Sequence, residues 1–168
     1  MRDTDLTLGE FLCFAIYSAG HAFNRVYKPL LDRLGLTYPQ YLVMVALWNE
    51  DGLSVGKIGE KLFLESNTLT PLLKRLESNG YLRRTRNPAD ERQVQVRLTE
   101  QGKALKQRAS EFPSCIVEAS GQKAADLQKL RDEIFALRDA LDRFDISALV
   151  QQPSITDTTI GKADPGIE

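Results

Sequence analysis

The residues from Ser54 to Leu98 carry the pattern that most restricts how this chain can fold. Apolar residues at helical spacing mark two short helices, at 55–62 and 66–79, with three residues between them. Two strands follow directly, at 81–86 and 93–98. A tight connection between two short helices is typical of a helix-turn-helix, and a hairpin after the second helix is typical of a wing. The sequence therefore predicts a mainly α-helical fold with a small β-hairpin (α+β), a winged helix-turn-helix.

Capping and turn residues support these boundaries. Ser54 and Ser66 are the predicted N-caps of the two short helices, and Asn79-Gly80 ends the second one. The segment 87–92 between the strands holds a proline and an aspartate, which favour a turn. The large side chains predicted to lie in the core include Met44, Trp48 and Phe63.

Longer helices flank this centre. They are predicted at 8–34, 37–50, 99–117 and 126–144. Pro29 and Pro113 lie inside the first and third of them, where a helix bends or restarts. The apolar stripes of the first and last helices find no partner in a small central lobe. Packing them against a second copy of the chain is the simplest solution, so we expect a dimer.

Composition excludes several classes of protein. No apolar run approaches the length of a membrane span, and Met1 is followed by charged residues, so we expect a cytoplasmic protein without a membrane partner. Two distant cysteines and one histidine, His21, form neither a disulfide framework nor a metal site, so no metal or cofactor is expected. No nucleophile stands beside a base, which argues against an enzyme.

Charge distribution is more informative than the net charge of −1. Between Lys74 and Arg108 the chain holds ten basic residues and four acidic ones. A local basic block in a neutral chain is typical of a face that contacts phosphates, although an ordinary solvated surface can look the same.

Two segments resemble the MarR family of bacterial transcription regulators. Asp90–Thr99 is similar to that family's wing, with an acid and an arginine at the tip and a strand that ends in Leu-Thr, and Ser66–Glu77 is similar to its recognition helix. The resemblance covers about residues 8–144. It implies a homodimeric repressor that binds a pseudo-palindromic operator in double-stranded DNA. The expected organisation is one domain over 1–144, with a DNA-binding lobe at about 37–99 and dimerisation helices at about 8–34 and 100–144, and a flexible polar tail over 145–168.

On this resemblance the recognition helix enters the major groove, where hydroxyl and amide groups approach base edges and cations reach phosphates. The expected DNA-binding residues are Ser66, Asn67, Thr68, Thr70, Lys74, Arg75, Arg86, Asp90 and Arg92. Arg92 is expected to enter the minor groove from the tip of the wing, and Asp90 to hold Arg92 by an ion pair.

A narrower resemblance lies near the N-terminus. Leu12–Ser18 and Leu36–Tyr41 are similar to the OhrR branch, whose members are repressors that sense organic hydroperoxides through a cysteine in the first helix. The resemblance implies that Cys13 is the sensor and that two tyrosines, Tyr27 and Tyr38, hold its thiolate. It also implies that Cys115 is the second cysteine found in some members.

The residues around Cys13 also allow a plain structural role. A cysteine between Leu12 and Phe14 fits a buried thiol, whose pKa burial would raise. Tyrosine hydroxyls that donate to the sulfur would favour the thiolate instead. If Cys13 and Tyr27 share one straight helix, however, they lie about 21 Å apart. Tyr27 then reaches Cys13 only from the other subunit, so the sensing hypothesis requires a dimer with interleaved N-terminal helices.

The expected mechanism begins with oxidation of Cys13 to a sulfenic acid by an organic hydroperoxide. An intersubunit disulfide with Cys115 follows, and the protein leaves its operator. Two alternatives stay open at this stage. One is a repressor of the same fold that is released by a small phenolic or aromatic ligand, with Tyr17, Phe23 and Trp48 lining the pocket or merely filling the core. The other is a thiol peroxidase.

Overall fold

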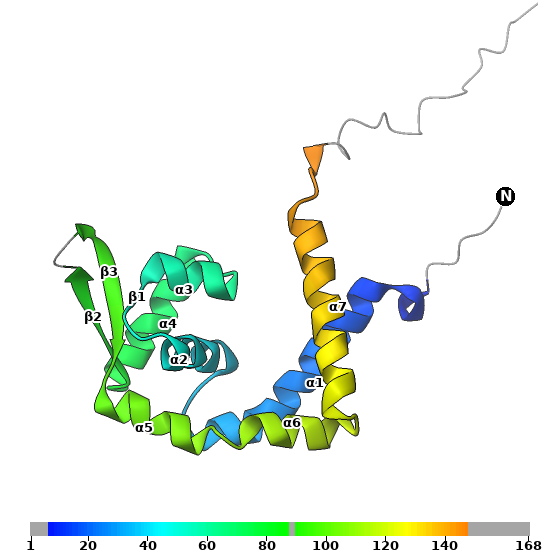
Figure 1. Cartoon of the computed structure of the whole chain (residues 1–168), viewed down its shortest axis with the longest axis horizontal. Coiled ribbons are helices and arrows are strands. Elements are labelled where there is room, and N and C mark those ends of the chain that lie inside the picture. Colours follow the sequence, from blue (N-terminus) through cyan, green and yellow to red (C-terminus); the bar gives the residue numbers. More distant parts are fainter. Residues whose placement is uncertain (1–6, 88–89, 148–168) are drawn as a thin grey trace, which may run out of the picture. The chain divides into compact units, whose positions relative to one another are not determined.

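The structure, a computed structural model, describes the backbone of residues 7–87 and 90–147 and the side chains of that part apart from 87 and 90–92. The chain divides into two compact units, Met1–Gly121 and Gln122–Glu168 (Figure 1). The first holds η1 (Leu8–Glu10, a 3-10 helix), α1 (Leu12–Asp32), α2 (Tyr38–Asn49), β1 (Leu53–Ser54), α3 (Val55–Leu62), α4 (Ser66–Ser78), β2 (Leu82–Asn87), β3 (Asp90–Leu98), α5 (Glu100–Arg108) and α6 (Phe112–Ser120); the second holds α7 (Ala124–Asp142).

The predicted winged helix-turn-helix is confirmed. Helices α3 and α4 form the helix-turn-helix, and the antiparallel hairpin β2–β3 follows α4 directly (Figure 1). The described strands form a three-stranded sheet in the order β1-β3-β2, with Leu53 of β1 opposite Val96 of β3. The sequence did not reveal β1, because two residues are too few to show an alternation. This short strand ties the base of the hairpin to the start of α3.

The core of the first unit lies between α2, α3, α4 and the sheet. Leu69, Leu73 and Leu76 place one face of α4 there, each with at most 1% of its surface exposed. The predicted core residue Met44 is completely buried, and Trp48 is half-buried with its indole Nε1 donating to Gly102 O at 2.9 Å. The opposite face of α4 is consequently free to meet a partner.

Phe63 was wrongly assigned to the core. Its backbone takes the left-handed conformation (φ 55°) that ends α3, and 63% of its surface is exposed. Gly59 explains why the turn is so tight, because a Cβ on that residue would lie 2.8 Å from Leu64 O. The sharp turn that joins the two helices therefore sends the aromatic ring outward.

The helix boundaries differ from the sequence prediction at several points. Glu65, and not Ser66, is the N-cap of α4, so Ser66 is the first helical residue. Pro29 lies inside an unbroken α1, whereas the helix predicted at 99–117 is divided into α5 and α6. Pro113 lies in the first turn of α6, a position where its missing N–H costs no helical hydrogen bond.

The second unit consists, in its described part, of α7 and the residues just after it. Apolar side chains of α7 are largely exposed there: Leu130 at 51%, Ile134 at 39% and Leu141 at 66%. The helix lies two residues earlier than predicted. From residue 148 onward, the predicted tail lies outside the described residues.

Candidate nucleic-acid interface and thiol site

Helix α4 begins with a run of polar side chains. Ser66, Asn67 and Thr68 are exposed in its first turn, and Thr70 is half-buried. Two local hydrogen bonds order this turn: Thr68 Oγ1 donates to Asn67 Oδ1 at 3.2 Å, and Thr70 Oγ1 donates to Ser66 O at 2.7 Å. The structure thus brings these four predicted DNA-binding residues together at one end of α4.

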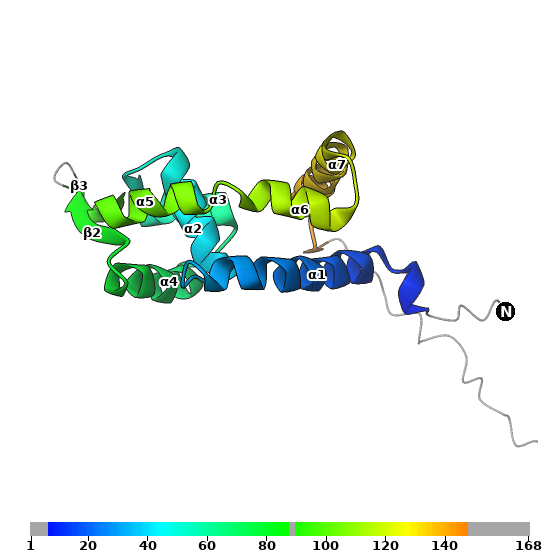
Figure 2. The same cartoon turned by 90° about the horizontal axis from the view of Figure 1, so that it is seen from below.

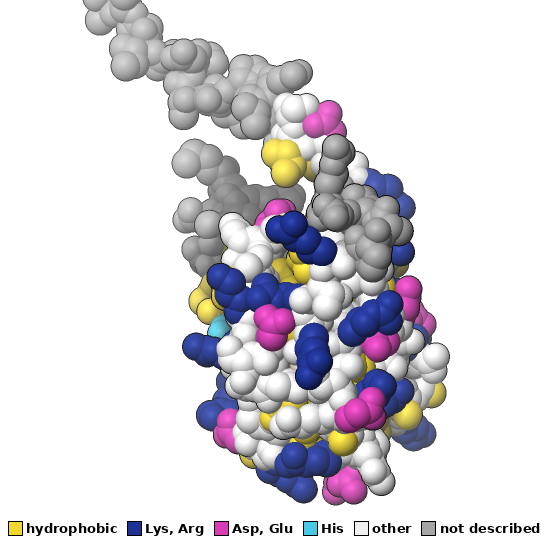
Figure 3. Space-filling model, turned by 90° about the vertical axis from the view of Figure 1, so that its left-hand side faces the viewer, with side chains coloured by type: hydrophobic (Ala, Val, Ile, Leu, Met, Phe, Trp, Pro, Cys, Tyr) yellow, Lys and Arg dark blue, Asp and Glu magenta, His cyan; other side chains and the backbone are white. Residues whose placement is uncertain are grey.

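The cations predicted to contact DNA lie on two elements. Lys74 and Arg75 are exposed on the second half of α4, and Arg86 is exposed on β2 opposite Val94. Lys and Arg side chains are spread over the hairpin side of the molecule (Figure 3). Asp90 and Arg92 belong to β3, but their side chains, and with them the predicted ion pair, lie outside the described residues.

A hollow of about 740 Å³ separates the helix-turn-helix from the hairpin. Lys57 of α3, Thr70 of α4 and Gln93 of β3 line it, together with Arg84 of β2. Sequence reasoning counted Arg84 only as part of the basic block. In the structure its guanidinium binds Glu77, and this hydrogen bonding holds the pKa of the Glu77 carboxyl below its usual range.

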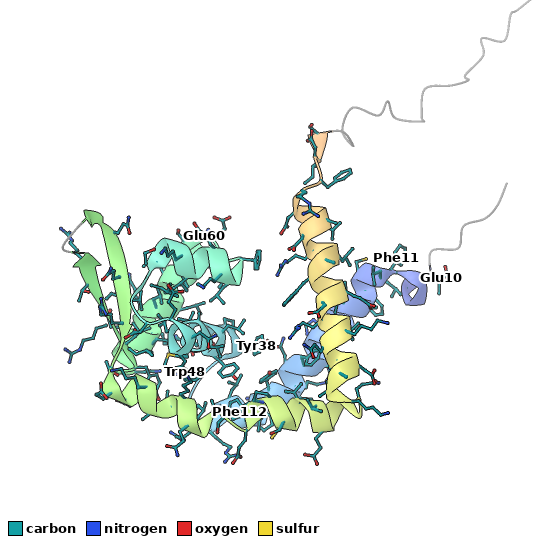
Figure 4. All side chains as sticks on the ribbon, viewed as in Figure 1. Glu10, Phe11, Tyr38, Trp48, Glu60 and Phe112 are labelled. Carbon is teal, nitrogen blue, oxygen red and sulfur yellow. The ribbon has the colours of Figure 1, made fainter. Side chains whose placement is uncertain are left out.

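The two tyrosines predicted to support a thiolate lie against each other. The ring centroids of Tyr27 in α1 and Tyr38 in α2 are 4.9 Å apart, and Tyr41 lies 5.9 Å from Tyr27. Tyr41 also contacts Phe112 and Trp48, at 5.6 and 6.0 Å (Figure 4 labels both, and Tyr38). These packed rings hold Tyr27 and Tyr38 in place.

Burial moves the pKa values of these phenols further above neutral pH. It raises the pKa of Tyr27 to about 12, with the neighbouring Tyr38 and Tyr41 adding to the shift. Burial raises the pKa of Tyr38 as well. Both side chains therefore keep an O–H group that can donate a hydrogen bond near neutral pH.

Cys13 lies at the opposite end of α1 from Tyr27. Because α1 is one continuous helix, the fourteen-residue separation corresponds to about 21 Å. Cys13 is exposed in the chain, contrary to the buried thiol that its neighbours Leu12 and Phe14 suggested. The structure does not bring Cys13 and either tyrosine together within one subunit.

Cys115 is half-buried in α6, and it is not near Cys13. Helices α1 and α6 lie side by side (Figure 2). An apolar groove of about 170 Å³ runs between them, lined by Phe23, Val26, Ile116 and small side chains. Of the other aromatics considered for a ligand pocket, Tyr17 is 64% exposed and Trp48 lines a separate hollow with Leu98 and Lys106.

The described part of the chain holds neither a metal-binding cluster nor a membrane-spanning helix. Residues 7–87 and 90–147 contain no group of three or more His, Cys, Asp or Glu side chains placed to hold a metal ion. Within the same ranges, no helix is long and apolar enough to cross a membrane.

The helix-turn-helix, the wing and the polar face of α4 define a winged-helix regulator of the DNA-binding class. A family model described as transcriptional regulator SarA/Rot matches residues 25–109. The chain is 45% identical to the organic hydroperoxide resistance transcriptional regulator of Bacillus subtilis, over 81% of this chain and 92% of that protein. It belongs to the MarR-type winged-helix transcriptional regulators, in the group that contains that organic hydroperoxide regulator.

Two further similarities agree with this family. The transcriptional regulator TtmR of Methylorubrum extorquens is 49% identical over 83% of this chain and 72% of its own length. The solved structure of AbfR of Staphylococcus epidermidis matches with a TM-score of 0.69 at 35% identity, over 79% of this chain and 92% of that chain. AbfR has also been solved in a reduced form bound to DNA and in a disulfide form.

Proposed function

We propose that this protein is a homodimeric repressor that leaves its operator when an organic hydroperoxide oxidises Cys13. One observation carries the proposal: Tyr27 and Tyr38 are packed as a protonated pair at the end of α1 that lies away from Cys13. These two hydroxyl donors have no thiolate beside them in their own subunit. They therefore fit a sensing site that is completed by Cys13 of the other subunit.

The DNA-binding step rests on the first turn of α4 and on the basic hairpin. Exposed Ser66, Asn67 and Thr68 form a polar surface that fits the major groove, while Lys74 and Arg75 supply charge for phosphates. Arg86 and the wing-tip residues Asp90 and Arg92 extend this contact along the duplex. In a dimer, two copies of α4 would read two half-sites of a pseudo-palindrome at a fixed spacing.

The apolar half of α1 supplies a reason to dimerise. Leu12, Ile16 and Phe23 are 60%, 40% and 44% exposed in the single chain. Burying this surface against a second α1 in antiparallel orientation lowers the free energy of the dimer and brings Cys13 toward the partner's tyrosines. The antiparallel pairing of the two α1 helices would then form both the dimer and the sensing site.

The oxidation transfers two electrons from sulfur to peroxide. The Cys13 thiolate attacks the distal peroxide oxygen, the O–O bond breaks, and the alkoxide leaves and takes up a proton to give the alcohol. The product is the Cys13 sulfenic acid. Hydrogen bonds from Tyr27 and Tyr38 to the thiolate keep it charged and ready to attack, and they weaken when its charge is lost.

Cys115 is the proposed resolving residue. Its thiolate attacks the sulfenic sulfur, a disulfide forms, and hydroxide leaves and becomes water. A disulfide holds its two Cα atoms only about 5–6 Å apart. Since Cys13 and Cys115 lie far apart within the chain, the bond is proposed to join two subunits and to displace α1 or α6. The disulfide form of the related AbfR is consistent with such a step.

Two cysteine variants test this function. Cys13→Ser should bind DNA but should stay bound when cumene hydroperoxide is added, whereas Cys115→Ser should still form a sulfenic acid, detected by intact mass, without a crosslinked dimer on a non-reducing gel. Release of Cys13→Ser at the wild-type peroxide concentration would contradict the proposal. Sustained peroxide consumption with a thiol reductant would indicate a thiol peroxidase instead.

A second candidate signal is favoured by the apolar groove between α1 and α6. Its volume of about 170 Å³ and its Phe23 and Ile116 walls suit a small aromatic molecule. Release of the Cys13→Ser variant by a phenolic acid such as salicylate would support this ligand-controlled alternative.

A further inference from the structure

An ion pair joins the end of α4 to the first strand of the hairpin. The guanidinium of Arg84 donates to Glu77 Oε2 from Nε at 2.9 Å and from Nη2 at 2.6 Å. The backbone N–H of Arg84 donates to the other carboxylate oxygen, Glu77 Oε1, at 2.9 Å. One carboxylate thus fixes both the side chain and the backbone of the strand residue.

This pair differs from the other described ion pairs of the first unit in its burial. Lys61 of α3 and Glu50 at the end of α2 also join two elements, at 3.3 Å, but their side chains are 49% and 55% exposed. Lys28–Asp32 and Lys103–Glu100 each lie within one helix, with side chains that are at least 53% exposed. The side chains of Arg84 and Glu77 are only 26% and 33% exposed, and they bridge two elements. A two-pronged, partly desolvated contact is the kind of ion pair that fixes geometry, whereas pairs on an open helix surface contribute little.

The position of Arg84 makes the bridge relevant to the interface. Arg84 lies opposite the fully buried Val96 in the hairpin and also lines the hollow between the helix-turn-helix and the wing. Glu77 lies in the last turn of α4, after the residues proposed to read DNA. The bridge therefore connects the last turn of the recognition helix to the first strand of the hairpin.

We infer that Glu77 and Arg84 are positioning residues, which hold the wing at the angle where it and α4 meet one duplex together. The inference rests on the proposed DNA binding. It assigns a favourable role to a carboxylate that, by charge alone, repels DNA. Arg84 accordingly serves the interface through Glu77 and does not contact a phosphate itself.

A direct contact between Arg84 and a phosphate would give the opposite binding results. If Arg84 were a phosphate contact for which Glu77 competes, removing the Glu77 charge would free the guanidinium and tighten binding. Removing Arg84 would then lower the dependence of log K on log salt by about one unit. If the pair is a bridge, both substitutions weaken specific binding and the salt dependence stays the same.

The experiment uses the full chain and two duplexes. The first is a 30-base-pair duplex selected by the wild-type protein from a random library, and the second is an unrelated duplex of equal length. Affinities are measured between 50 and 200 mM salt for Glu77→Gln, Arg84→Met, the double variant and Arg84→Lys. Asp32→Asn is the matched control, because it removes one carboxylate from an exposed pair within α1.

We expect Glu77→Gln and Arg84→Met each to weaken binding to the selected duplex about tenfold, and the double variant to be no weaker than either. Arg84→Lys should also weaken binding, since a lysine cannot reproduce the two-pronged contact. Binding to the unrelated duplex should change by less than about twofold, as should all binding by Asp32→Asn. Urea unfolding checks that every variant is folded under the binding conditions.

Tighter binding by Glu77→Gln, or additive losses in the double variant, would overturn the inference. If the wild-type protein selects no duplex at all, the proposed DNA binding fails instead. The bridge is then tested by hydrogen exchange of the β2 and β3 amides, which Glu77→Gln should accelerate while Asp32→Asn leaves it unchanged. Equal exchange in all three proteins would also overturn the inference.

Discussion

The recognition helix α4 and the N-terminal half of α1 are both amphipathic, but the apolar face of α4 is buried within the chain and that of α1 is exposed. Leu69, Leu73 and Leu76 of α4 are at most 1% exposed, because the chain covers them itself. Leu12 and Ile16 of α1, which lie one helical turn apart, are 60% and 40% exposed. The helix-turn-helix therefore buries its apolar face within one subunit, whereas the N-terminal half of α1 needs a second subunit to cover its apolar side chains.

The largest expected effect separates these two regions by the same substitution. Leu76→Ala removes a completely buried side chain and should lower the free energy of unfolding by about 2–5 kcal/mol at any protein concentration. Leu12→Ala should instead raise the dimer dissociation constant and destabilise the protein mainly at low concentration. Urea unfolding at two protein concentrations, with analytical ultracentrifugation, measures both. A concentration-independent loss for Leu12→Ala would show that α1 is completed within its own subunit.

A smaller effect is expected from Tyr27, which lies at the end of α1 that packs against the rings of Tyr38 and Tyr41. The pKa of Tyr27 is about 12 in the folded chain and about 10 when unfolded, so folding favours the protonated form. This contribution, at most about 2–3 kcal/mol, is fully present below pH 10 and is lost as pH rises from 10 to 12. Absorbance at 295 nm should show Tyr27 ionising about two pH units later than an exposed tyrosine. Because burial also raises the pKa of Tyr38, Tyr27→Phe should lower the amplitude of the late step by the absorbance of one tyrosine. An unchanged amplitude would contradict the assignment.

The smallest effect concerns the thiol. Each tyrosine hydroxyl that donates to the Cys13 thiolate should contribute about 1.5 kcal/mol, so Tyr27→Phe and Tyr38→Phe should each slow oxidation by cumene hydroperoxide about tenfold. Tyr81→Phe is the control, because the Tyr81 hydroxyl already donates to Leu34 O, at 3.3 Å. Stopped-flow detection of sulfenic acid gives the rates. Equal rates in the three variants would exclude a thiolate-supporting role for Tyr27 and Tyr38.

Local sequence signals predicted the parts of the fold that depend on nearby residues. The helix-turn-helix and hairpin follow from periodicity and turn residues. The miss at Phe63 has a different cause: an aromatic residue reads as core by type, while its left-handed backbone directs it outward.

Contacts between different helices and strands could not be predicted from the sequence. Strand β1 exists only through its pairing with β3, and Glu77 meets Arg84 only because the chain turns between them. Helical spacing relates residues three or four apart, so a pair seven apart gives no signal. The candidate thiol site was predictable only in part for the same reason. Tyr27 and Tyr38 could be named from the resemblance, but their packing against Tyr41 required the structure.

The central claim is that each sensing site takes its cysteine from one subunit and its tyrosines from the other. A heterodimer of one Cys13→Ser subunit and one Tyr27→Phe/Tyr38→Phe subunit tests it most directly, because the one remaining Cys13 then faces intact tyrosines across the dimer. Co-expression with two different tags isolates this species, and stopped-flow mixing with cumene hydroperoxide measures its oxidation. The account predicts oxidation at the wild-type rate with half the wild-type amplitude. Oxidation at the slow rate of the double tyrosine variant would contradict it.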